Sequence, residues 1–321
     1  MTTAFITGIT GQDGYYLANH LLAAGYEVHG LVRGQRNPKR RDVERDLPDV
    51  KLHDGDITDE ASIRRLLARV APDEVYNLAA VSYVQYSFEN PVLTAETTGV
   101  AVLRLLEVLR DHPTVRFYQA STSEMFGLAA SSPQNESTPF HPRSPYAVSK
   151  VFAHHAVVNY REAYGLFAVS GILFNHESPR RGAEFVTRKV TQGVAAIKAG
   201  RKDMIELGNL DARRDWGFAG DYVRAMHLML QQPSPSDFVV GTGTTHSVRD
   251  LVSVAFRVAG LDWQQHVKST ADNLRPADVP DLRADASRAK QKLGWTSETS
   301  FEDLIAAMVE ADIRRSETAA G

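Results

Sequence analysis

The residues of this chain with the clearest chemical potential are a tyrosine and a lysine four positions apart, Tyr146 and Lys150. On a helix this spacing puts both side chains on one face, about one turn apart. A phenol with an ordinary pKa of about 10 is a weak base at neutral pH. A neighbouring ammonium group and a bound nicotinamide cation would both stabilise its phenolate. The pair therefore predicts a base that takes a hydroxyl proton while a hydride leaves the same carbon.

A glycine-rich turn near the N-terminus is suited to hold the cofactor that such chemistry needs. It lies between an expected strand at residues 4–7 and an expected helix at residues 16–24. Glycines permit positive φ angles and let backbone N–H groups approach a pyrophosphate at the helix N-terminus. In this strand–turn–helix context the pattern predicts a dinucleotide-binding unit. The predicted cofactor contacts are Gly8, Thr10, Gly11, Gln12, Asp13 and Gly14.

Arg33 follows the second expected strand, at residues 27–32, where a site that prefers NAD carries an acidic residue for the ribose 2′-hydroxyl. A guanidinium group pairs with a 2′-phosphate instead, so this position predicts NADP. After the third expected strand, Asp56 and Ile57 are predicted to flank the adenine. The residues at the end of the fourth strand are predicted to line the cofactor site beside the nicotinamide, where small side chains let the cofactor lie close to the strand. They are Leu78, Ala79 and Ala80.

The elements that must position these residues alternate regularly along the first half of the chain. Strands are expected at residues 4–7, 27–32, 51–53, 74–78, 116–120 and 167–173. Helices are expected at residues 16–24, 60–70, 100–109 and 146–164. This alternation predicts an α/β fold of the Rossmann type, a doubly wound parallel sheet with helices on both faces. The polar and densely charged residues 34–46 are predicted to form a surface loop.

After Asn175 the alternation gives way to loops rich in Arg, Gly and Asp, and a final helix is expected near residues 301–314. We therefore expect a smaller mixed α/β domain that binds the substrate. The predicted NADP-binding domain comprises residues 1–174 and about 216–240. The predicted substrate domain comprises residues 175–215 and 241–321.

Composition excludes several classes of protein. The 321 residues are 43% hydrophobic and 23% charged, which is ordinary globular usage and argues against disorder. The formal net charge of −3 gives no broad field for nucleic acid or an anionic membrane. The absence of cysteine excludes disulfides, thiolate zinc sites and a cysteine nucleophile. No apolar run approaches the roughly 20 residues of a membrane span, and no signal peptide is evident, so we expect a cytoplasmic protein.

Longer stretches of sequence resemble those of a known family. They are residues 7–14 (TGITGQDG), 119–127 (QASTSEMFG), 144–146 (SPY), 174–182 (FNHESPRRG), 185–189 (FVTRK) and 207–217 (LGNLDARRDWG). In these the chain resembles the GDP-mannose 4,6-dehydratases, which belong to the extended short-chain dehydrogenase/reductases. The resemblance extends from the first strand to about Trp295.

The resemblance implies an NADP-dependent conversion of GDP-D-mannose to GDP-4-keto-6-deoxy-D-mannose. Temporary oxidation at C4 acidifies the C5 proton, water leaves across C5–C6, and the hydride returns to C6. By the same likeness Tyr146 is the oxidising base, Lys150 lowers its pKa, and Thr122 hydrogen-bonds the C4 oxygen. Glu124 takes the C5 proton and then protonates the departing C6 hydroxyl.

The resemblance also implies binding residues. His176 and Arg181 are expected on the nicotinamide and pyrophosphate side of the cofactor, and Ser82 beside both cofactor and substrate. No second ligand stands at metal-ligand spacing from His176, so no metal site is expected. The implied substrate contacts are Ser82, Ser123, Glu124, Asn175, Phe185, Val186, Lys189, Leu207, Gly208, Arg214, Arg275 and Asp278.

Two positions depart from the family pattern. Asp278 stands where the family has Glu, which shortens the reach toward the nucleoside. Gly34 follows Arg33 where relatives have a second Arg and serines, in a loop that reaches the cofactor of a neighbouring subunit. A homodimer packed through the helix at residues 146–164, or a homotetramer, is expected.

Two alternatives remain open at this stage. A GDP-4-keto-6-deoxymannose reductase or a nucleotide-sugar 4-epimerase on the same scaffold would need Tyr146 and Lys150 but no eliminating carboxylate, so Glu124 disfavours both. A sensor or scaffold protein that binds NADP without turnover usually lacks the Tyr and Lys pair that this chain has.

Overall fold

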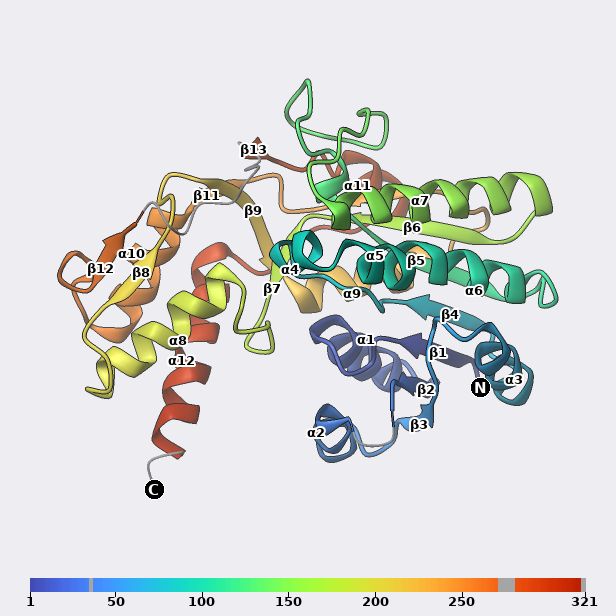
Figure 1. The fold of residues 1–321 in the computed structure, drawn as a ribbon, viewed down its shortest axis with the longest axis horizontal. Helices are drawn as coiled ribbons and strands as arrows, with labels where there is room; N and C mark the ends of the chain where they lie inside the picture. Colours follow the sequence, from blue (N-terminus) through green and yellow to red (C-terminus); the bar gives the residue numbers. More distant parts are fainter. Residues whose placement is uncertain (35–36, 271–280, 319–321) are drawn as a thin grey trace.

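A parallel sheet of seven strands forms the centre of the computed structural model, which describes residues 1–34, 37–270 and 281–318 (Figure 1). The strand order is β10-β6-β5-β4-β1-β2-β3, and every neighbouring pair is parallel. The order reverses between β1 and β4, which opens a crevice at the carboxyl ends of the strands. The predicted Rossmann-type fold is therefore confirmed. The strands are β1 Thr3–Thr7, β2 Glu27–Val32, β3 Lys51–Asp54, β4 Glu74–Asn77, β5 Arg116–Thr122, β6 Ala168–Leu173 and β10 Phe238–Val240.

Helices cover both faces of this sheet, as buried apolar strands require. On one face α1 (Gln12–Ala23) and α9 (Ala219–Leu230) share a core that includes Leu17 and Met226. The helices on the other face share a second core that includes Ile63, Leu105 and Val157. These helices are α3 Glu60–Val70, α6 Ala101–Leu109 and α7 Pro145–Tyr164.

A second, smaller unit stands beside the carboxyl edge of the sheet, at the left of Figure 1. Three of its short strands, β7, β11 and β13, pair with β9, and β8 pairs with β12 in a separate ribbon. Its three helices share a core that includes Trp216, Leu251 and Met308. The strands are β7 Asn175–Glu177, β8 Ile205–Leu207, β9 Arg213–Phe218, β11 Thr245–Ser247, β12 Val267–Ser269 and β13 Asp281–Leu282. The helices are α8 Val186–Lys198, α10 Val248–Ala259 and α12 Phe301–Thr318.

One helix falls on the other side of the predicted division of the chain. Helix α11 (Ser287–Leu293) lies in the range expected for the substrate domain, yet it packs against α9 and β10 of the large sheet. Its Ala289 and Leu293 belong to the core shared by α1 and α9. The chain therefore returns to the large sheet twice after β7, once with α9 and β10 and once with α11.

The predicted surface loop at residues 34–46 is wrong for most of its length, because Pro38–Asp46 forms helix α2. The Oδ1 atom of Asn37 accepts a hydrogen bond from the Lys39 N–H at 3.0 Å, and Pro38 occupies the first turn, where it needs no donor. Arg40 and Glu44 form an i,i+4 ion pair at 2.8 Å. Caps and charges stabilise this helix, which buries only Val43.

Shorter elements complete the described chain. They are α4 Val84–Glu89, α5 Pro91–Ala95, the π-helical turn η1 Glu96–Val100 and the 3-10 turns η2 Ser123–Met125 and η3 Trp263–Gln265. Within residues 1–34, 37–270 and 281–318, no helix combines the length and the apolar character needed to cross a membrane. The same residues contain no group of three or more acidic or histidine side chains arranged to hold a metal ion.

Candidate active site

A cavity of about 580 Å³ opens at the carboxyl edge of the large sheet, where β1 to β6 end. This is the position at which doubly wound sheets bind their ligands. The cavity brings together most of the residues that the sequence analysis singled out. They are Gly8, Thr10, Gly11, Gln12, Asp13, Gly14, Arg33, Asp56, Ile57, Leu78, Ala79, Ala80, Ser82, Thr122, Ser123, Glu124, Tyr146, Lys150, Asn175, His176, Arg181 and Phe185.

The remaining predicted substrate contacts do not line this cavity. Val186 and Lys189 stand on the first turn of α8, directly after Phe185. Leu207 ends β8 in the second unit, and Gly208 follows it. Arg214 of β9 is buried, and its guanidinium group donates to the carbonyl of Arg213 at 2.7 Å. The predicted contacts Arg275 and Asp278 lie outside the described residues.

The glycine turn has the shape that a pyrophosphate needs. Gly8 has a φ of +73°, and a Cβ atom there would stand 2.8 Å from the backbone nitrogen of Ala79. A Cβ atom on Gly14 would stand 2.5 Å from the carbonyl oxygen of Gly8. Gly11 caps α1 and offers no side-chain acceptor, so the first N–H groups of the helix remain available to an anion. The residues present therefore fit a dinucleotide cofactor.

Helix α7 carries the tyrosine and lysine to the end of β5. The Ser144 hydroxyl caps its N-terminus by accepting from the Ala147 N–H at 3.1 Å. Tyr146 and Lys150 point to the buried side, with exposures of 8% and 3%. The Lys150 ammonium donates to the carbonyl of Ala120 at 2.7 Å and stands 5.8 Å from the centre of the Tyr146 ring. The backbone of β5 thus holds Lys150 beside Tyr146.

Burial shifts the pKa values of both Tyr146 and Lys150 away from their ordinary values. It raises the pKa of Tyr146, a hydrogen bond with Thr122 opposes the rise, and the Glu124 carboxylate adds to it. Burial lowers the pKa of Lys150 to about 8, while the Asp13 carboxylate resists that fall. At pH 7 Tyr146 is therefore neutral and Lys150 is still mainly protonated. A further cation beside the phenol, such as an oxidised nicotinamide, would favour the phenolate.

Glu124 stands where β5 gives way to the turn η2. Its backbone N–H donates to the Thr122 hydroxyl at 3.3 Å, and its half-buried side chain lines the same cavity as Tyr146 and Lys150. The next residues, Met125 and Phe126, are fully buried and anchor the turn. A carboxylate thus lies in the same cavity as the tyrosine. An elimination requires such a group and a simple hydride transfer does not.

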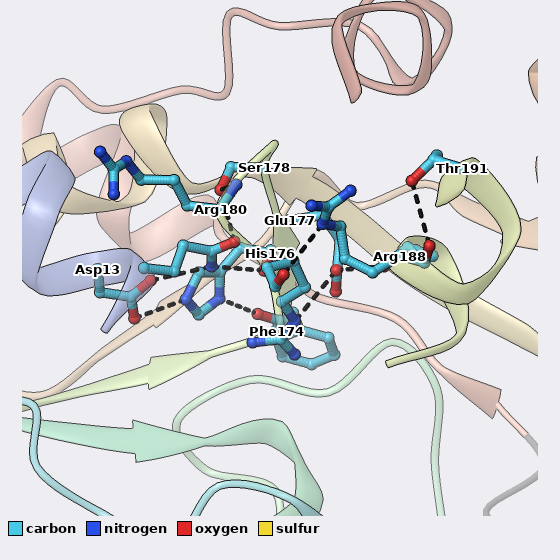
Figure 2. Close-up of polar contacts among 11 residues, drawn as sticks. Asp13, Phe174, His176, Glu177, Ser178, Arg180, Arg188 and Thr191 are labelled. Carbon is cyan, nitrogen blue, oxygen red and sulfur yellow. Dashed lines mark hydrogen bonds and ion pairs between the residues drawn. The ribbon is translucent and has the colours of Figure 1, made fainter. Parts of the chain in front are cut away.

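A partly buried ion pair joins the glycine turn to the second unit. Figure 2 shows His176 between Asp13 and Phe174: its Nε2 atom lies 2.8 Å from Asp13, and its Nδ1 atom lies 2.8 Å from the Phe174 carbonyl. Burial works against both charges. Even so, their mutual attraction holds the pKa of Asp13 below its ordinary value and the pKa of His176 above it. The pair fixes the start of β7 against the first turn of α1.

Arg181 is held in the cavity wall by its neighbours. Its Nε atom lies 3.1 Å from the buried carboxylate of Glu177, which also accepts a hydrogen bond from the Thr187 hydroxyl. Its guanidinium group lies 3.5 Å from the centre of the Phe185 ring. This arrangement presents a cation to the cavity close to the glycine turn.

The cavity also contains residues that the sequence analysis missed. Asn37, Pro38 and Lys39 enter it from the start of α2, and the Asn-Pro capping pair was a signal that could have revealed that helix. Thr97 enters from the π-helical turn η1, a kind of turn that is frequent at functional sites. No pattern in the sequence indicates that turn.

Comparison with known proteins identifies the family. The family model described as GDP-mannose 4,6 dehydratase matches residues 5–308. GDP-mannose 4,6 dehydratase 2 of Arabidopsis thaliana is 53% identical over 323 residues, which cover 97% of this chain and 86% of that protein. The GDP-mannose 4,6-dehydratase of Vibrio cholerae is 48% identical over 348 residues, which cover 97% of this chain and 94% of that protein.

Solved structures share the fold. The Thermus thermophilus UDP-glucose 4-epimerase in complex with NAD aligns with a TM-score of 0.84 at 26% identity, covering 97% of this chain and 99% of the epimerase. The sequence identities and the family match reach almost the whole length of the protein. The chain therefore belongs to the GDP-mannose 4,6-dehydratase family of the extended short-chain dehydrogenase/reductases.

Proposed function

We propose that this protein dehydrates GDP-D-mannose to GDP-4-keto-6-deoxy-D-mannose with NADP as its recycled cofactor. Membership of the family supports the overall reaction. The observation that carries the mechanism is the meeting of Glu124, Tyr146 and Lys150 in one cavity with the glycine turn. When bound, NADP would supply a hydride acceptor for C4 and a hydride donor for C6.

Tyr146 takes the proton of the C4 hydroxyl in the proposed reaction. Lys150, held by the Ala120 carbonyl, keeps a positive charge beside the phenolate. The Thr122 hydroxyl, which is hydrogen-bonded to Tyr146 in the structure, is placed to share the C4 oxygen. Together these groups stabilise the charge that develops as the hydroxyl becomes a ketone.

Glu124 performs the elimination. The C4 ketone makes the C5 proton acidic, and the Glu124 carboxylate takes it. The same carboxyl group then protonates the C6 hydroxyl, which leaves as water. Tyr146 releases the proton that it took from the C4 hydroxyl, and C5 gains one proton. Tyr146 and Glu124 therefore end the cycle in the protonation states in which they began it.

A simple incubation tests the reaction type. The purified protein with GDP-mannose should give a product lighter by one water molecule, without net accumulation of NADPH. A product with the same mass as GDP-mannose would indicate an epimerase. Reduced cofactor formed in proportion to product would indicate a dehydrogenase. Either result would contradict the proposed function.

NADP preference is the finer part of the cofactor proposal. A nicotinamide cofactor is supported by the glycine turn and by the NAD that the Thermus epimerase holds. Arg33 and Lys39 both line the cavity beyond the end of β2, where a 2′-phosphate would lie. Two cations at that position favour NADP over NAD.

Replacing Arg33 with Glu should weaken NADP binding at least tenfold and leave NAD binding nearly unchanged, because the new carboxylate repels only the 2′-phosphate. Titration of both cofactors by calorimetry measures the two affinities. Arg41→Glu on the exposed side of α2 is the matched control, since Arg41 does not line the cavity. Equal losses for NADP and NAD, or an equal loss in the control, would contradict this assignment.

The second unit is proposed to bind the nucleotide sugar. Asn175 and Phe185 line the cavity where this unit meets the large sheet, so they are suited to contact the sugar and the diphosphate. Lys189 and Arg214 would then contact the GDP portion beyond the cavity, together with Val186, Leu207 and Gly208. The division into an NADP-binding unit and a nucleotide-sugar unit follows from this placement.

An exposed apolar surface supports the proposed homodimer. It is formed by Tyr86, Phe88, Val92 and Leu93 of α4 and α5 together with Val148 and Phe152 of α7. Val92 is 73% exposed and Val148 is 54% exposed, and contiguous apolar residues of this kind mark association surfaces. A second copy of the chain, packed helix against helix, would cover them.

Val148→Asp should therefore shift the protein toward the monomer in sedimentation velocity, because a charge would be buried at the interface. Met204→Asp is the control, as Met204 is similarly exposed but lies next to β8, away from this surface. A sedimentation coefficient unchanged by Val148→Asp would contradict the proposed interface.

A further inference from the structure

A second cavity, of about 240 Å³, lies beside the glycine turn on the side facing α2 and the second unit. Lys39 of α2, Arg180 of the loop after β7, Arg188 of α8 and Arg315 of α12 contribute to its wall. It shares Thr10, Gly11, Lys39 and Arg181 with the larger cavity. Basic side chains from both units therefore converge at one place next to the predicted pyrophosphate site.

The carboxylates around this cavity are shared between guanidinium groups. Asp312 pairs with Arg188 and also with Arg315, the latter at 3.2 Å. Asp46 pairs with Arg180 and also with Arg45, the latter at 2.7 Å. Asp312 serves two guanidinium groups and neutralises only one of them, so one positive charge remains there. Arg45 also pairs with Asp42 at 3.2 Å, so Asp42 and Asp46 together balance Arg45 and Arg180.

The geometry holds these cations in place. The Arg315 guanidinium donates to the Pro179 carbonyl at 2.8 Å, and Arg188 Nε donates to the Arg181 carbonyl at 3.1 Å. The Arg180 guanidinium stacks over the Tyr15 ring at 3.4 Å from its centre. Arg188 is 7% exposed, so water screens its charge little.

The charge balance around the cavity is positive. Lys39 has no ion-pair partner among the residues that the structure describes. The lining groups and their direct partners comprise six cations and four carboxylates, a surplus of two positive charges. A phosphate monoester carries about −1.5 to −2 charges at neutral pH, which matches that surplus. The cations are Lys39, Arg45, Arg180, Arg181, Arg188 and Arg315, and the carboxylates are Asp42, Asp46, Glu177 and Asp312.

We propose that this cavity binds a phosphate group separate from those of cofactor and substrate, as inorganic phosphate or as a small phosphate monoester. Its volume falls below the roughly 300–1,000 Å³ of ordinary ligand pockets, so a compact anion fits it better than a nucleotide. Because Lys39 lines both cavities, phosphate bound here competes with a 2′-phosphate for that ammonium group. This coupling, though not the site itself, rests on the proposed NADP preference.

Calorimetric titration of the nucleotide-free full chain with inorganic phosphate tests the site, and a parallel titration with a hexose phosphate distinguishes the two ligand sources. Arg315→Gln and Lys39→Gln should each weaken binding at least fivefold. Arg314→Gln is the matched control, since Arg314 neighbours Arg315 on α12 and pairs with Glu310 away from the cavity. Binding that both variants leave intact, an equal loss in the control, or no heat with either phosphate compound would overturn the proposal.

A separate titration tests the coupling. Saturating phosphate should raise the dissociation constant of NADP by a larger factor than that of NAD, and Lys39→Gln should make the two factors equal. Phosphate binding without this difference would overturn the shared role of Lys39 and leave the site standing. Equal affinities for NADP and NAD without phosphate would instead contradict the proposed cofactor preference.

Discussion

Glu124→Gln should lower the rate of dehydration by about 10³-fold or more while cofactor and nucleotide sugar still bind. The amide occupies the same space but cannot take the C5 proton or protonate the leaving hydroxyl. Positioned acid–base groups contribute about 10² to 10⁴ each, and this carboxylate is proposed to act in both steps. The loss of water from GDP-mannose, followed by mass spectrometry, measures the rate.

The same variant should still oxidise C4, because Tyr146 and Lys150 remain in place. A single turnover would then accumulate the absorbance of reduced cofactor that the unaltered protein does not show. Glu89→Gln on α4 is the control, since that exposed carboxylate does not line the cavity. Full activity of Glu124→Gln would remove Glu124 from the mechanism.

Tyr146→Phe should abolish both half-reactions, with a fall in rate of about 10³-fold. Phenylalanine keeps the ring that packs in the buried site but has no hydroxyl to accept the C4 proton. Unlike Glu124→Gln, this variant should therefore show no reduced cofactor in a single turnover. Measuring the two variants side by side separates the oxidation step from the elimination step.

Tyr164→Phe provides the comparison within the same helix, because Tyr164 is 49% exposed at the end of α7. Its activity should equal that of the unaltered protein. If Tyr146→Phe retained the reduced-cofactor signal, another group would have to be the oxidising base.

The large sheet could be predicted from the sequence because all its strands except the edge strand β3 are largely buried. Residues 167–173 form a strongly apolar run and correspond to β6, and residues 116–120, which include the polar Arg116 and Gln119, correspond to the start of β5. The glycine turn and the pair Tyr146 and Lys150 were likewise predictable, since each is a pattern within a few consecutive residues. Patterns of this kind can be recognised without knowing which distant segments the fold brings together.

Contacts between distant segments could not be predicted in the same way. Strand β7 has three residues and exists because it pairs with β9 some forty positions later. Asp13 and His176 were both expected near the cofactor, but nothing local shows that they pair across 163 positions. Helix α2 was missed because caps and ion pairs stabilise it rather than an apolar face.

A labelled substrate gives the most direct test of transient oxidation at C4. GDP-mannose carrying deuterium at C4 should yield a product that carries the deuterium at C6, within the same molecule and without dilution by added unlabelled NADPH. This outcome requires the hydride to leave C4, stay on the bound cofactor and return after water has left. Deuterium lost to solvent, or diluted by hydrogen from the added NADPH, would contradict the account.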